Sequence, residues 1–91
     1  MAVRQTSLNT EAEFLRALGD TLRVSRVQRG LSRRKVAIQV ETDVASLRDI
    51  EEGHAEPDSW LLVRLGYACG LTFAELWART ERRVRRPKSS D

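Results

Sequence analysis

Cysteine and histidine are nearly absent from this sequence, which contains one residue of each, Cys69 and His54. A single cysteine cannot form an internal disulfide bond, and one cysteine with one histidine cannot supply the usual ligands of a zinc site. Cys69 lies in the apolar segment LGYACGL, where we expect a buried structural thiol, because cysteine is among the residue types most often buried. A redox role or a disulfide-linked dimer is the alternative.

Long apolar runs are also missing. No segment approaches the roughly 20 apolar residues that a membrane-spanning helix requires. Residues 1–10 have no basic segment followed by an apolar one, as a signal peptide would. We therefore expect a soluble, cytoplasmic protein without a membrane partner.

Residue patterns that carry catalysis are missing as well. The sequence has no Ser/His/Asp or Cys/His set, no carboxylate pair with a defined pocket and no glycine-rich phosphate loop. His54 follows a glycine, in a position more typical of a loop residue than of a catalyst. We therefore expect a protein that is not an enzyme and that uses no cofactor and no bound metal.

Charge is distributed unevenly along the 91 residues, which carry a formal net charge of +3. Residues 23–35 contain six basic side chains and no acidic one, whereas residues 41–58 contain seven acidic side chains and one basic side chain, Arg48. Residues 79–88 contain six basic side chains and one acidic side chain. Mild basicity permits nucleic-acid binding but does not establish it.

The composition, with 41% hydrophobic and 32% charged residues, is typical of one small globular domain. Apolar residues recur at helical spacing, and no segment alternates as a strand would. The predicted helices span 11–28, 33–40, 44–52, 60–69 and 73–83. We expect a flexible segment over 1–10, a domain over 11–78 and a basic extension over 79–91.

The two short predicted helices, 33–40 and 44–52, are joined by a turn of about three residues, which is typical of a helix-turn-helix motif. Capping residues mark the helix starts: Thr10, Ser32, Asp43, Asp58 or Ser59, and Thr72. In the last helix, the spacing predicts that Phe73, Leu76 and Trp77 face the core.

Taken together, residues 18–77 resemble the lambda-repressor/Cro-type helix-turn-helix family, also called the XRE family, without any insertion. The matching positions are Leu18-Gly19, Leu22-Arg23, Arg26, Gly30-Leu31-Ser32, Ala37, Leu47, Ile50-Glu51, Gly53, Pro57, Leu65, Leu71 and Glu75-Leu76. The resemblance implies an all-α, compact five-helix lambda-repressor-like DNA-binding domain. It also implies a structural ion pair between Arg26 and Glu51.

The resemblance further implies that the protein binds operator DNA as a homodimer, with helix 44–52 in the major groove. Its expected partners are double-stranded DNA and a second copy of the chain. Arg33 corresponds to the family position that touches the DNA backbone, where helix N-terminal amides also favour phosphate. The groove-facing residues that the resemblance implies are Val44, Ala45, Ser46, Arg48 and Asp49. We also expect Arg34 and Lys35 to add charge beside Arg33, and His54 to approach a phosphate.

Two positions depart from the family pattern. Glu41 stands where the family usually has glycine, and a positive φ costs a non-glycine residue about 1 kcal/mol or more. We therefore expect a slightly different turn at Glu41. Ser25 replaces a usual apolar residue, which predicts a thinner core there.

Helix 44–52 leaves two functions open. Arg48 can bind guanine, which favours a sequence-specific transcriptional regulator, and we expect this regulator to be a repressor. Arg48 can instead pair with Glu52, one helical turn later. The acidic surroundings then favour a protein-interaction module, for example an antitoxin-like or accessory factor, that binds a basic partner. The basic residues 79–88 fit either an arm along DNA or a solubilising helix end.

Overall fold

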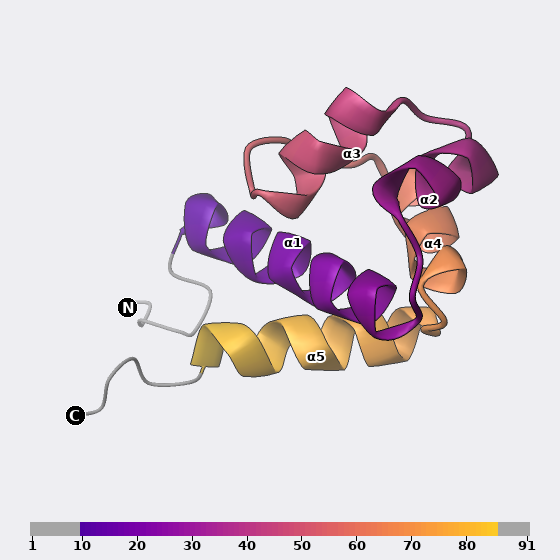
Figure 1. The fold of residues 1–91 in the computed structure, drawn as a ribbon. Coiled ribbons are helices and arrows are strands. Elements are labelled where there is room, and N and C mark those ends of the chain that lie inside the picture. The colour runs from indigo at the N-terminus through magenta and orange to yellow at the C-terminus, as the bar shows by residue number, and fades with distance from the viewer. Residues whose placement is uncertain (1–9, 86–91) are drawn as a thin grey trace, which may run out of the picture.

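The computed structural model describes residues 10–85 of the chain, which form five helices joined by short connections (Figure 1). The helices are α1 (Glu11–Gln28), α2 (Arg33–Val40), α3 (Val44–Glu51), α4 (Ser59–Ala68) and α5 (Phe73–Arg85). This range contains no strand, and the predicted all-α, five-helix fold class is confirmed. The predicted flexible segment 1–10, except Thr10, and residues 86–91 of the predicted basic extension lie outside the described residues.

The helix bounds follow the capping signals of the sequence. α1 and α2 have the predicted bounds, whereas α3 ends one residue early because Glu52 is its C-cap. Asp58, rather than Ser59, accepts the hydrogen bond that starts α4, from the backbone N–H of Leu61 at 2.8 Å. α5 continues to Arg85, so it includes the first part of the predicted basic extension.

The core lies where α1 packs on α3, α4 and α5, and where α2 packs on α3 and α4. Its buried side chains come from all five helices and from the turns between them: Leu18, Leu22, Val36, Ala37, Val40, Leu47, Ile50, Leu65, Ala68, Cys69, Leu71 and Leu76. Ser25 is buried as well, where the sequence predicts a thinner core. This core holds α2 and α3 on the side of α1 away from α5 (Figure 1).

Cys69 is buried at the C-terminal end of α4, and its thiol donates to the backbone oxygen of Leu22 at 3.7 Å. Burial raises the pKa of this thiol to about 11. Since the thiolate is the reactive form, the Cys69 thiol is inert at neutral pH. The structure therefore supports the structural interpretation of Cys69 over a redox role.

Two aromatic side chains of α5 do not face the core as predicted. Phe73 is 52% exposed and Trp77 is 41% exposed. The buried side of α5 is centred on Leu76 and Thr80, which lie one turn apart, and Trp77 lies at its edge. There the Trp77 ring packs on Phe14 of α1, with the ring centroids 5.5 Å apart. The prediction was wrong because helical spacing alone does not fix which edge of an apolar stripe is covered.

The turn between α2 and α3 does not change its conformation to avoid a positive φ at Glu41. The sequence had predicted a slightly different turn there. Glu41 takes the left-handed conformation, with φ 63° and ψ 46°, at the C-terminal end of α2. The backbone N–H of Thr42 then donates to the oxygen of Ala37 at 2.9 Å. The glutamate thus occupies a conformation that favours glycine, and the geometry of the turn is kept.

No single helix within residues 10–85 is long and apolar enough to cross a membrane. α4 and residues 73–84 of α5 reach the required length only when joined, and they are bent by 94° at their break.

Candidate nucleic-acid interface

α3 has one buried side and one exposed side. Leu47, Ile50 and Glu51 point into the molecule, and the exposed side carries Ala45, Arg48 and Asp49. These exposed positions recur every three or four residues, so they form one row along the helix. Val44 is also exposed, at the first turn of α3.

Ser46 differs from the other α3 residues that were predicted to contact DNA. It is only half-exposed, and it takes part in the N-cap of α3. Its backbone N–H donates to Asp43 Oδ1 at 2.7 Å, and its hydroxyl donates to Asp43 Oδ2 at 3.0 Å. These hydrogen bonds hold the pKa of Asp43 below its ordinary value of 3.8. The Asp43 carboxylate therefore stabilises the start of α3, and the hydroxyl proton of Ser46 is already used in a hydrogen bond to it.

Arg48 lies free of ion pairs within the part of the chain that the structure describes. The alternative pair with Glu52 is not formed. Glu52 instead lies close to His54, with 3.6 Å between Glu52 Oε1 and His54 Nδ1. His54 is exposed in the loop that follows α3. The guanidinium of Arg48 is thus available to an outside acceptor.

The start of α2 presents a second group of cations, Arg33, Arg34 and Lys35. Ser32 caps this helix by accepting from the backbone N–H of Lys35 at 3.0 Å. Arg34 and Lys35 are exposed, whereas Arg33 has a partner inside the protein. The Nε of Arg33 donates to Glu51 Oε1 at 2.8 Å, and its side chain is 31% exposed.

The ion pair between Arg26 and Glu51 that the resemblance implies is present. Arg26 Nε donates to Glu51 Oε2 at 2.6 Å, and Arg26 Nη2 donates to Glu51 Oε1 at 3.0 Å. The hydrogen bond to Glu51 raises the pKa of Arg26, against the opposite effect of burial. Glu51 therefore joins α1, α2 and α3 through two guanidinium groups. Their positive charges offset the cost of burying its negative charge.

Sequence reasoning missed the contact between Arg33 and Glu51. The two residues are 18 positions apart, and helical spacing relates only residues three or four positions apart. The family position of Arg33 suggested a DNA contact, which gave no reason to look for a partner inside the protein. The available signal was the charge of Glu51, since a buried carboxylate attracts every cation within reach.

Gly19 fixes how closely α1 crosses the end of α3. A Cβ atom at this position would lie 2.5 Å from the backbone oxygens of both Ile50 and Glu51. Any larger residue would push the two helices apart. The close approach holds the C-terminal end of α3 against α1, and so determines the direction of the exposed row.

These features define a helix-turn-helix DNA-binding domain: a capped α2, a tight turn, and an α3 with one face exposed. A protein-family model described as "Helix-turn-helix domain" matches residues 17–80. The chain belongs to this family, of the XRE-like type, as the sequence predicted.

The solved structures that are similar to this chain include two of the clp gene regulator ClgR from Corynebacterium glutamicum. One has a TM-score of 0.76 and 27% sequence identity, over 78% of this chain and 76% of that chain. The other has a TM-score of 0.71 and 28% identity, over 74% of this chain and 86% of that chain. A comparison with curated proteins finds no match. The fold and the family are those of DNA-binding regulators rather than of enzymes.

Proposed function

We propose that this protein represses transcription by binding a specific operator sequence through α3. The supporting observation is the exposed row of Ala45, Arg48 and Asp49, in which the Arg48 guanidinium has no ion-pair partner within residues 10–85. A guanidinium in the major groove binds the O6 and N7 atoms of guanine, and Ala45 or Val44 can contact a thymine methyl group. Asp49 can accept from the amino group of cytosine.

Phosphate contacts from α2 support the same orientation on DNA. Arg33 uses only its Nε for Glu51, and its two Nη groups make no hydrogen bond within the described part of the chain. Glu51 thereby holds the Arg33 side chain at the start of α2, with Nη donors left for a phosphate. Arg34 adds a second exposed cation there, and we propose a phosphate contact for His54, which is exposed in the loop after α3.

The similarity to ClgR, a clp gene regulator, supports a regulatory role over a purely structural one. We propose a cytoplasmic location, in a bacterial, phage or plasmid context, where such a regulator meets its operator. Binding of the operator would exclude polymerase from the promoter, which is the basis of the proposed repression.

We further propose a homodimer that binds two half-sites about one helical turn of DNA apart. The exposed aromatic side chains Phe73 and Trp77 of α5 support an interface on that helix. Sedimentation velocity tests this proposal: the wild-type protein should sediment as a dimer and Trp77→Ala should shift it toward the monomer.

The decisive experiment is selection of bound fragments from random double-stranded DNA. The wild-type protein should enrich one sequence, and Arg48→Ala should relax the preference at one base pair, at a cost of about 1–3 kcal/mol in binding free energy. Arg23→Ala removes the same charge from an exposed position of α1 and is the matched control. If the protein enriches no sequence above random DNA at moderate salt, the proposed function is wrong.

The acidic side chains around α3 favour a second candidate function, binding of a basic protein partner. Glu52, Glu56 and Asp58 are all exposed. A basic protein that co-purifies, and whose binding is lost when Glu52 and Glu56 are changed to glutamine, would support this alternative. A failure of DNA selection together with that result would replace the operator-binding proposal.

A further inference from the structure

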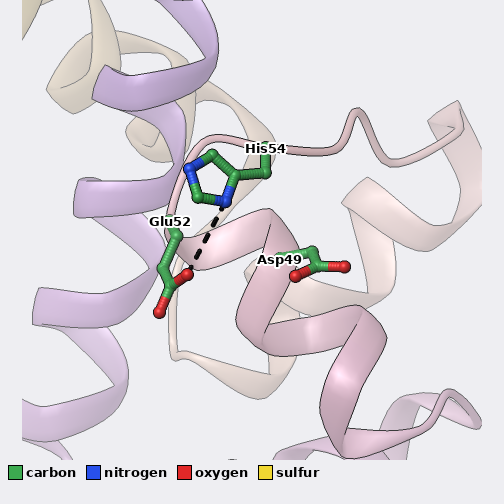
Figure 2. Close-up of side chains that lie close together, drawn as sticks. All are labelled: Asp49, Glu52 and His54. Atoms are coloured by element: carbon green, nitrogen blue, oxygen red, sulfur yellow. Dashed lines mark ion pairs between the residues drawn. The ribbon is translucent and has the colours of Figure 1, made fainter.

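Three side chains with metal-ligating atoms meet at the C-terminal end of α3. Figure 2 shows Asp49 on the helix, Glu52 at its end and His54 in the following loop. One ligand atom from each residue can be chosen so that all three atoms lie within 4.8 Å of one another. All three side chains are exposed, so an ion can reach them from solvent.

The backbone brings these residues together. Gly53 has a φ of +80°, which turns the chain back at the end of α3. The backbone N–H of His54 then donates to the oxygen of Asp49 at 2.8 Å, and that of Gly53 donates to the oxygen of Ile50 at 3.1 Å. This pair of hydrogen bonds is the Schellman motif of a helix end. This helix end places the His54 imidazole beside the last helical turn of α3, which carries Asp49 and Glu52 (Figure 2).

We propose that Asp49, Glu52 and His54 form a surface site for a divalent transition-metal ion, with Zn²⁺ as the representative ion. An imidazole nitrogen and carboxylate oxygens are ordinary zinc ligands, and imidazole also suits nickel and copper. The imidazole separates this group from a simple acidic cluster, because Mg²⁺ and Ca²⁺ take oxygen ligands and gain nothing from it.

The required rearrangement is small. Zinc at about 2.0–2.2 Å from each donor brings tetrahedral donors to about 3.3–3.6 Å from one another. The Glu52 and His54 atoms are already 3.6 Å apart, and the three ligand atoms lie within 4.8 Å of one another, so rotation of exposed side chains is the change required. Three protein ligands leave a coordination position for water. The neighbouring cation Arg48, on the same helix, opposes binding and keeps the affinity moderate.

A bound ion would make the α3 surface less negative. The effect of this change on DNA binding rests on the proposed function. The two carboxylates repel DNA phosphates, and a bound dication offsets both charges. Zinc should therefore raise the general affinity of the protein for DNA phosphates. It should also remove the proposed Asp49 contact with cytosine and the His54 contact with phosphate, because both side chains then bind the ion. Metal binding itself needs no DNA and is tested without it.

Isothermal titration of untagged, metal-free full chain with ZnCl₂ tests the site. The wild-type protein should bind one ion, and His54→Gln, Asp49→Asn and Glu52→Gln should each weaken binding by about tenfold or more. Glu56→Gln removes a nearby exposed carboxylate outside the group and should bind as the wild type does. All four positions are exposed, so circular dichroism should report an unchanged fold.

Absence of zinc binding up to millimolar concentration, or equal binding by wild type and His54→Gln, would overturn the proposed site. A separate DNA titration distinguishes the two proposals. If zinc binds as expected but DNA selection fails, the site stands and the proposed function is wrong. If DNA is bound but zinc is not, the reverse holds.

Discussion

At the scale of single residues, Glu41 is the strained position, the one non-glycine residue with positive φ among residues 10–85. We expect Glu41→Gly to raise the free energy of unfolding by up to about 1 kcal/mol, because relief of the left-handed conformation exceeds the entropy cost of glycine. Glu41→Val should lower it, since a β-branched residue fits this conformation worst. Urea denaturation measures both changes.

The side chain of Glu41 provides the control for that prediction. Its carboxylate accepts from Arg64 Nη1 at 3.3 Å, but it is 82% exposed, so the pair contributes little. Glu41→Gln keeps the strain and removes the charge, and it should leave stability nearly unchanged. A stability loss in Glu41→Gly as large as that in Glu41→Val would contradict the argument from strain.

Thr80 is a second residue whose native side chain lowers the stability of the protein. It is fully buried in α5, and its Oγ1 makes no hydrogen bond within the described part of the chain. Thr80→Val replaces the hydroxyl with a methyl group of similar size and should raise the free energy of unfolding by about 1 kcal/mol. Thermal unfolding followed by circular dichroism measures the change.

Thr21 of α1 is the matched control for Thr80. It is equally buried, but its hydroxyl donates to the oxygen of Ala17 at 2.9 Å and accepts from Arg83 Nη1 at 3.3 Å. Thr21→Val should therefore destabilise the protein. If both valine variants change stability in the same direction, hydrogen bonding does not distinguish the two sites.

At the scale of the helices, most of the fold could be predicted from the sequence because local signals determine where each helix begins. Ser32 and Asp43 cap α2 and α3 as expected, and the bounds of α1 and α2 are those predicted. The exposure of Phe73 and Trp77 could not be predicted, since it depends on how α5 is rotated against α1. Packing between elements carries that information, and local spacing does not.

The N-cap of α3 gives a prediction about pH. Hydrogen bonds from Ser46 hold the pKa of Asp43 below its ordinary value in the folded protein. A carboxyl group with a lowered pKa contributes stability above its unfolded pKa and loses that contribution as pH falls through the folded value. Asp43→Ser keeps a capping oxygen that does not titrate, so its deficit relative to wild type should shrink below about pH 4.

Melting temperatures of both proteins between neutral and acidic pH measure this effect. The two curves should converge as the pH falls, because the wild type alone loses the charge of the α3 cap. Parallel curves over the whole range would mean that Asp43 contributes only as a neutral hydrogen-bond acceptor.

At the scale of the whole molecule, the candidate site was predictable only where it follows from the family register. The exposed row on α3 and the pair of Arg26 with Glu51 follow from that register. The contact of Arg33 with Glu51 and the meeting of Asp49, Glu52 and His54 do not. The first depends on the packing of α2 against α3, and the second on the turn at Gly53, so both required the three-dimensional structure.

Glu51 joins three helices, and its removal should affect the whole molecule. Its carboxylate is 1% exposed and faces the guanidinium groups of both Arg26 and Arg33. Glu51→Gln keeps the shape but leaves the buried Arg26 charge uncompensated, which should lower the free energy of unfolding by about 3–5 kcal/mol. Arg33→Ala removes the more exposed partner and should cost far less. Chemical denaturation measures both, with exposed Glu52→Gln as control; a Glu51→Gln protein as stable as that control would show that the pair does not hold the three helices together.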